Sequence, residues 1–103
     1  MTDKLFGALS LSKRAGALVL GFDAAAEAAA AGKAPLILLA NDLSPKTAKR
    51  ILTATKDIVP VHTLPYSLLD LAPITRKGAG ILAVTDKNLA ELILRELTAQ
   101  PPA

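Results

Sequence analysis

The sequence predicts an α/β fold, a three-layer αβα sandwich in which helices cover both faces of a central sheet. Three observations support this prediction. Four short apolar segments, each suited to one strand, alternate along the chain with segments of helical character. Segment 36–40 is apolar without interruption, which is typical of a strand that is covered on both faces. The length of 103 residues is that of one domain, and we expect residues 1–103 to form it.

The chain is expected to begin with a helix, a strand and a second helix. Apolar residues recur at helical spacing up to Lys13, which predicts a first helix over about 2–13. The apolar run 17–20 predicts a short strand. Alanine has the highest intrinsic helix propensity, so the alanine-rich segment 24–31 predicts a second helix, with Asp23 in position to cap it.

The middle of the chain predicts the central strand and a basic helix. The strand is segment 36–40. Ser44 can accept hydrogen bonds from the free amides of a helix that starts at Pro45, because proline fits the first helical position. This third helix is expected to extend to about Lys56. Its apolar residues share one side, and basic side chains gather on the other side at Lys46, Lys49 and Arg50.

The last part of the chain predicts two strands, each followed by a helix. Residues 61–63 form a brief strand, which leads through a turn into a short helix over 66–71. Pro73 is expected to stop this helix, because proline cannot continue the helical hydrogen bonds. Residues 81–84 form the fourth strand, and Asp86 caps a last helix with a regular apolar stripe.

The composition excludes several classes of protein. The chain has no cysteine and one histidine, which excludes disulfide scaffolds, thiolate metal sites and histidine-rich sites, and we expect no metal and no cofactor. No apolar run is long enough to cross a membrane and no signal peptide is recognisable, so we expect a cytoplasmic protein without a membrane partner. The net charge of +3 arises in the first half of the chain and favours an anionic partner.

No catalytic motif stands out. His62 is the only imidazole, and no serine or carboxylate is tied to it by a recognisable motif. Segment 32–33 lacks the serine or threonine of a phosphate-binding loop, and segment 78–80 lacks the third glycine of a dinucleotide-binding turn. We therefore expect a protein that is not an enzyme and has no catalytic residue.

The turns after two of the predicted strands are candidates for binding an anion. Residues 21–23 and 41–43 each lead into the N-terminus of a helix, where free amides and the helix dipole favour a phosphate group. If both turns lie at the same edge of the sheet, they form one polar ledge. The basic residues expected to contact phosphates there are Lys13, Arg14, Lys46, Arg76 and Lys77.

Several segments, taken together in their order and spacing, are similar to those of a known superfamily. They are LSLSKRAG at 9–16, LG at 20–21, GKAPLILLAND at 32–42, VPV at 59–61 and ILAVTD at 81–86. From Leu5 to Leu97 the chain resembles the kink-turn RNA-binding ribosomal proteins, and within them the small bacterial branch of YlxQ-like ribosomal-protein homologues. The step of eleven residues from Gly21 to Gly32 is part of this resemblance.

The resemblance implies an αβα sandwich with a mixed four-stranded sheet, acting as a non-enzymatic clamp on sharply bent RNA. Recognition in that superfamily uses the start of the second helix, the loop after the second strand and the loop before the fourth strand. These regions correspond here to 21–27, 41–46 and 73–78, and they include the polar ledge inferred from the helix N-termini.

The second helix differs from that of the best-characterised kink-turn binders. Those proteins carry Asn, Glu and, one turn later, Lys, which read purine edges in the RNA; the matching residues here are Asp23, Ala24 and Glu27. An ionised Asp cannot donate to guanine, and Ala makes no polar contact. Since one good base contact contributes ~1–3 kcal/mol, we expect kink-turn recognition to be weaker by orders of magnitude. Phe22 can instead stack on an unpaired base, or simply pack as an apolar residue.

The sequence as a whole predicts a monomeric, non-enzymatic RNA-binding protein similar to ribosomal proteins. Its expected partner is structured RNA, with ribosomal RNA among the candidates and DNA not expected. Two alternatives stay open, a protein-interaction module that kept the fold but lost kink-turn RNA binding, and a small enzyme acting on a phosphorylated metabolite. The predicted RNA-binding residues are Lys13, Arg14, Gly21, Phe22, Asp23, Asn41, Asp42, Lys46, Arg76, Lys77 and Gly78.

Overall fold

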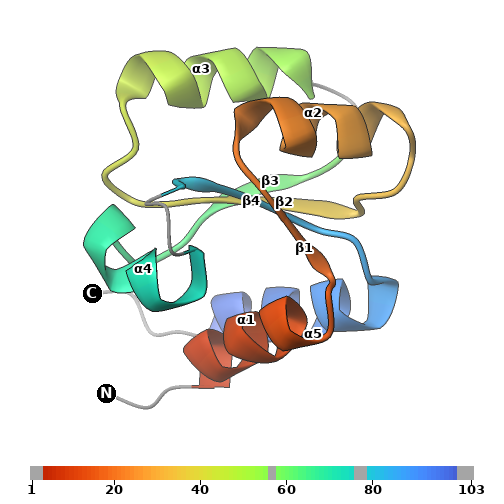
Figure 1. Cartoon of the computed structure of the whole chain (residues 1–103), viewed down its shortest axis with the longest axis vertical. Helices are drawn as coiled ribbons and strands as arrows, with labels where there is room; N and C mark the ends of the chain where they lie inside the picture. Colours follow the sequence, from red (N-terminus) through yellow and green to blue (C-terminus); the bar gives the residue numbers. More distant parts are fainter. Residues whose placement is uncertain (1–3, 56–57, 76–78, 100–103) are drawn as a thin grey trace.

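Four short strands form one mixed sheet at the centre of the computed structural model, which describes residues 4–55, 58–75 and 79–99 (Figure 1). They lie in the order β1 (Leu18–Leu20), β4 (Ile81–Val84), β2 (Leu36–Leu39) and β3 (Val61–Thr63). β4 is antiparallel to both of its neighbours, whereas β2 and β3 are parallel. The mixed four-stranded sheet that the resemblance implied is confirmed.

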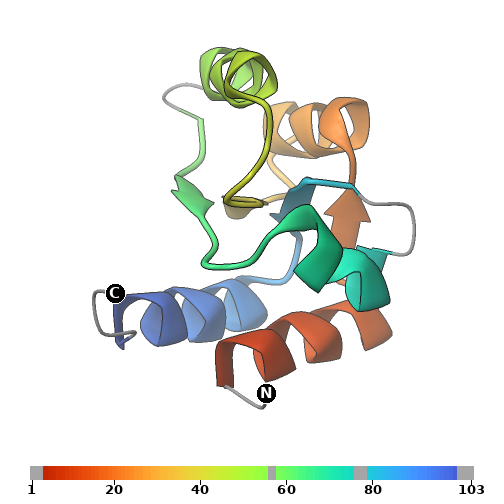
Figure 2. The same cartoon turned by 90° about the vertical axis from the view of Figure 1, so that its left-hand side faces the viewer.

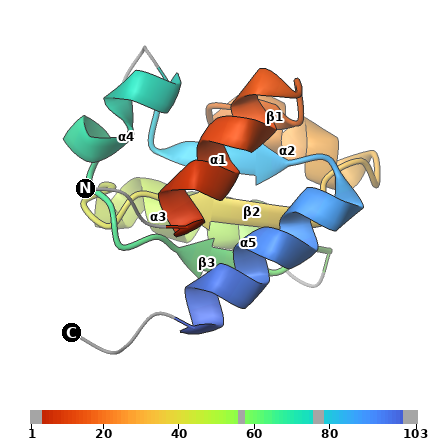
Figure 3. The ribbon, with the colours of Figure 1, turned by 90° about the horizontal axis from the view of Figure 1, so that it is seen from below.

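Helices cover both faces of this sheet. α2 (Phe22–Ala30) and α3 (Pro45–Ala54) lie on one face, and α1 (Lys4–Arg14), α4 (Leu68–Thr75) and α5 (Lys87–Ala99) lie on the other (Figure 1). α1 and α5 pack against each other across the sheet, and α4 lies near one edge of it (Figure 3). The predicted three-layer αβα sandwich is therefore confirmed.

The side chains of β2 divide between two hydrophobic cores, because successive residues of a strand point to opposite faces. Leu36 and Leu38 belong to the core on the side of α1, α4 and α5. Ile37 and Leu39 belong to the core under α2 and α3. All four of these strand residues are buried. The uninterrupted apolar run of β2 thus reflects a strand with both faces covered, as predicted.

The N-cap residue of α2 is Gly21, and the prediction that Asp23 caps this helix was wrong. The Gly21 carbonyl accepts a 3.0 Å hydrogen bond from the Ala25 amide, so the helical pattern starts two residues earlier than expected. Gly21 can occupy this position because its backbone adopts φ 98° and ψ 161°, a region that is essentially restricted to glycine. Asp23 lies in the first turn of α2 instead.

α4 starts and ends later than the helix predicted over 66–71. Ser67 and Asp70 cap its start reciprocally, because the amide of each donates to the side chain of the other at 3.0 Å. Pro73 lies inside α4, so the prediction that it stops the helix was wrong. A proline leaves one helical hydrogen bond unmade, yet α4 continues for two more residues, to Thr75.

The starts of α3 and α5 follow the prediction more closely. Asp86 accepts a 3.0 Å hydrogen bond from the Leu89 amide at the start of α5, as expected. Ser44 is the N-cap residue of α3 and Pro45 its first residue, but the Ser44 hydroxyl makes no capping hydrogen bond. α3 ends at Ala54, two residues before the predicted end.

Candidate nucleic-acid interface

Three chain segments meet at one edge of the sheet. β1 and β2 both pair with β4 in the antiparallel direction, so their C-terminal ends lie at the same edge as the start of β4. The Gly21 amide donates to the Ile81 carbonyl and the Ala40 amide donates to the Gly80 carbonyl, both at 2.9 Å. We call this edge the rim; it comprises residues 21–23, 40–43 and 79–80. The two turns after β1 and β2 therefore share one edge, which is what a single polar ledge requires.

The start of α4 is fastened to the rim by two hydrogen bonds. The Asn41 amide donates to the Tyr66 carbonyl at 2.8 Å, and the Leu68 amide donates to the Asp42 carboxylate at 2.8 Å. Figure 2 shows α4 beside the loop that leads from β2 to α3. Asp42, which the sequence suggested only as an RNA contact, thus also caps a helix that is 26 residues away in sequence.

Replacing Asp42 by alanine should lower the free energy of unfolding by about 1 kcal/mol, because the Leu68 amide loses its acceptor. Urea denaturation followed by circular dichroism measures this change. Asp42→Asn is the matched control, since its side-chain oxygen can still accept the hydrogen bond and most of the stability should remain. Equal loss in both variants would show that the carboxylate does not act as this cap.

Six of the predicted RNA-binding residues lie at the rim or directly beside it. Asp23, Asn41 and Asp42 have exposed side chains, and Phe22 is half-buried. Lys46 is exposed in the first turn of α3, which the rim segment 40–43 leads into. These residues, with Gly21, form the part of the predicted site that the structure brings together.

The other predicted cations are not part of this cluster. Lys13 and Arg14 occupy the last turn of α1, ahead of β1, and both are exposed. The Ala17 carbonyl just before β1 accepts a 2.9 Å hydrogen bond from the Thr85 amide just after β4, so the start of β1 lies at the edge opposite the rim. Lys13 and Arg14 therefore approach the sheet from the opposite edge. The predicted contacts Arg76, Lys77 and Gly78 lie outside the described residues.

The N-terminus of α3 is the better of the two anion sites that the helices offer at the rim. α2 carries Asp23 in its first turn, whereas α3 has no acidic residue there and carries Lys46. The Ser44 hydroxyl makes no capping hydrogen bond, which leaves the first amides of α3 available to another acceptor. Amides, helix dipole and lysine all favour an anion at this point.

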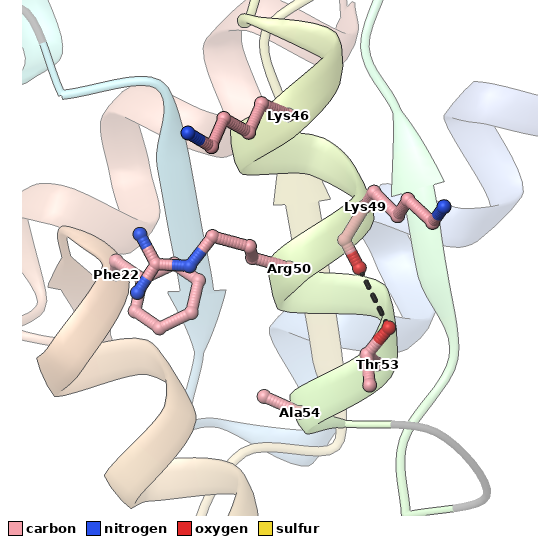
Figure 4. Close-up of a pocket in the computed structure, with 6 residues that line it drawn as sticks. All are labelled: Phe22, Lys46, Lys49, Arg50, Thr53 and Ala54. Atoms are coloured by element: carbon pink, nitrogen blue, oxygen red, sulfur yellow. Dashed lines mark hydrogen bonds between the residues drawn. The ribbon is translucent and has the colours of Figure 1, made fainter.

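A groove between α2 and α3 continues from the rim. Its volume is about 390 Å³, and it is lined by Phe22, Lys46, Lys49, Arg50, Thr53 and Ala54. The guanidinium carbon of Arg50 lies over the Phe22 ring, 4.8 Å from its centroid, a distance typical of a cation–π contact. Figure 4 shows Lys46 and Arg50 pointing from α3 toward α2, whereas the ammonium group of Lys49 points away. We call this feature the α2–α3 groove.

Sequence reasoning found the basic face of α3 but did not assign Lys49 or Arg50 to the site. The spacing of four residues between Lys46 and Arg50 was the available signal, because it places both on one side of a helix. The contact of Arg50 with Phe22 depends on how α2 packs against α3, which the spacing does not reveal.

Other kinds of site are less well supported in the described part of the chain. No group of three or more His, Asp or Glu side chains is arranged there to hold a metal ion. None of the helices described is both long and apolar enough to cross a membrane. His62 lies on the edge strand β3 with its side chain exposed.

The chain was compared with known families and structures. Residues 3–94 match the model of the ribosomal protein L7Ae/L30e/S12e/Gadd45 family. A protein of unknown function from Bacillus halodurans has the same fold with a TM-score of 0.85 and 20% identity, over 94% of this chain and 99% of that one. The Giardia lamblia 15.5 kD RNA binding protein gives a TM-score of 0.71 and 17% identity, over 95% of this chain and 88% of that one. No curated protein sequence matches the chain.

Because the two structures are only 20% and 17% identical to this chain, they establish its fold and no more. The match to the family model establishes the family. Its match extends from before α1 into α5 and so includes the rim and the α2–α3 groove. The protein therefore belongs to the ribosomal protein L7Ae/L30e/S12e/Gadd45 family.

Proposed function

We propose that this protein binds structured RNA and catalyses no reaction. The observation that carries the proposal is the meeting of segments 21–23 and 40–43 at one rim, beside the open N-terminus of α3 and the exposed Lys46. Free amides and cations are the groups that hold an RNA backbone. Membership of a family of ribosomal proteins supports the proposal, and one protein of the same fold is itself named an RNA binding protein.

Phosphate groups are expected to bind at the start of α3 rather than at the start of α2. The exposed carboxylate of Asp23 repels an anion near the α2 N-terminus. Gly21 and Asn41 then shape the part of the rim that faces the bases, with Asp42 holding α4 beside them. Arg76 and Lys77, which lead toward β4, remain part of the proposed phosphate contacts.

Within the family we place the protein in the YlxQ-like bacterial branch, with ribosomal RNA as the first partner to test. Asp23 and Glu27 are exposed on α2 and provide no donor for a guanine edge. We therefore expect the RNA to be held mainly through its backbone, with weak discrimination between a kink-turn and other bent or irregular RNA.

Affinity for RNA should fall as salt rises. The measurement is a fluorescence titration of a labelled kink-turn RNA, and of an unbent RNA duplex of equal length, at 50 and 200 mM KCl. Two or three phosphate contacts predict that Kd rises roughly 10- to 40-fold between these concentrations, because each neutralised phosphate releases counterions. A DNA duplex of the same sequence should bind more weakly than the RNA.

Lys46→Ala tests the proposed phosphate site directly. It should weaken binding to all the RNAs by a similar factor and reduce the slope of log Kd against log salt by about one. Binding that is undetectable at both salt concentrations, or that does not respond to salt, would contradict RNA binding at the rim. A preference of more than about 100-fold for the kink-turn would instead show that base edges are read.

A further inference from the structure

We propose that an unpaired RNA base stacks on Arg50 in the α2–α3 groove, while the phosphate next to that base is held by Lys46. This inference rests on the proposed RNA binding. It adds a contact surface that extends beyond the rim, along α3, and it assigns a role to an arginine that the rim itself does not use.

The Arg50 guanidinium, resting on the Phe22 ring, forms a flat surface. Phe22 is half-buried and packs against the core under α2 and α3, so its ring is held in place. The guanidinium carbon of Arg50 lies 4.8 Å from the ring centroid, and the Arg50 side chain is exposed. One side of the planar guanidinium is therefore occupied by the ring and the other is accessible. RNA-binding proteins commonly stack unpaired bases on such a plane.

The charge and size of the groove fit one nucleotide. Lys46 and Arg50 point into the space between α2 and α3 (Figure 4), and none of the described residues that line it is a carboxylate. Its volume of about 390 Å³ lies within the range of sites for small ligands. Thr53 and Ala54 also line the groove, and both have small side chains.

The position of the groove favours a nucleotide of an RNA chain that also crosses the rim. Phe22 follows the rim residue Gly21 directly, and Lys46 lies in the first turn of α3, where we place a phosphate. A strand seated on the rim can therefore continue into the groove without leaving the protein surface. A base that is paired within a duplex has no free face, so the groove should select an unpaired one.

The test compares two RNA hairpins that share one stem, one with a three-nucleotide bulge that contains 2-aminopurine and one fully paired. Arg50→Ala should weaken binding of the bulged hairpin about 5- to 150-fold, the effect typical of losing one stacked base. It should weaken binding of the paired hairpin no more than a few-fold. The wild-type protein should change the 2-aminopurine fluorescence of the bulged hairpin, and Arg50→Ala should not.

Two further variants separate stacking from charge. Arg50→Lys keeps the charge but removes the planar group, so it should lose most of the same affinity for the bulged hairpin. Arg95→Ala removes a positive charge from α5, on the opposite face of the sheet, and should change binding less than about threefold. Both residues are exposed, so neither change should affect folding, which thermal unfolding checks.

The outcomes distinguish this inference from the function on which it rests. If the wild-type protein binds neither hairpin, RNA binding itself is wrong. If it binds both hairpins equally, or if Arg50→Lys binds the bulged hairpin as the wild type does, only the stacking site is wrong. Selective loss in both Arg50 variants, together with an unaffected Arg95→Ala, supports the site.

Discussion

Replacing Leu38 by alanine is expected to lower the free energy of unfolding by about 2–5 kcal/mol. Leu38 is fully buried at 0% exposure and lies in β2, between β4 and β3, facing the core formed with α1, α4 and α5. Neighbours on both sides hold the strand, so the cavity left by the missing atoms cannot collapse easily. Small domains have only about 5–15 kcal/mol of stability, and this single change removes a large part of it.

Urea unfolding followed by far-ultraviolet circular dichroism measures this loss, and Leu69→Ala is its matched control. Leu69 is 82% exposed on α4, so the same change of side chain should alter stability by less than about 0.5 kcal/mol. A loss below about 1 kcal/mol for Leu38→Ala would mean that β2 is not the centre of the core.

The fold class was predictable because β2 must be covered on both faces. Its four residues alternate between the two cores, and no arrangement with helices on one face only would bury them all. The start of α5 was predictable from its local cap at Asp86. The start of α4 was missed although Ser67 and Asp70 form a local capping box, whereas the further hydrogen bond from the Leu68 amide to Asp42 joins residues that are distant in sequence and meet only through the fold.

The candidate site was predictable only in part, for a related reason. Parallel strands place their C-terminal ends at one edge, so the two turns after β1 and β2 belong together whatever the details of packing. Lys13 and Arg14 are close to Gly21 in the sequence, but β1 lies between them and the rim, so they lie toward the opposite edge of the sheet. The α2–α3 groove depends on the contact of Arg50 with Phe22, which forms between two separate helices.

Replacing Gly21 by alanine is expected to lower stability by about 1–3 kcal/mol and to weaken RNA binding as well. Gly21 adopts φ 98° and ψ 161°, a conformation that alanine strongly disfavours. A Cβ atom at Gly21 would meet no atom within 4 Å beyond its chain neighbours, so the cost lies in the local backbone conformation and not in a clash with the surrounding structure. The strain cannot be relieved locally, because the Gly21 amide donates to Ile81 and its carbonyl accepts from Ala25.

Gly7→Ala separates the backbone effect from the addition of a methyl group. Gly7 lies inside α1, is exposed and also has nothing within 4 Å of a Cβ position. There alanine should raise stability by roughly 0.5–1 kcal/mol, because it loses less conformational entropy in a helix than glycine does. The two variants add the same atoms and should shift the urea midpoint in opposite directions.

RNA affinity should fall only for Gly21→Ala, since a shift of the junction between β1 and α2 moves Phe22, on which Arg50 rests. If Gly21→Ala unfolds at the wild-type midpoint and binds RNA unchanged, the conformation of this junction does not set the geometry of the rim.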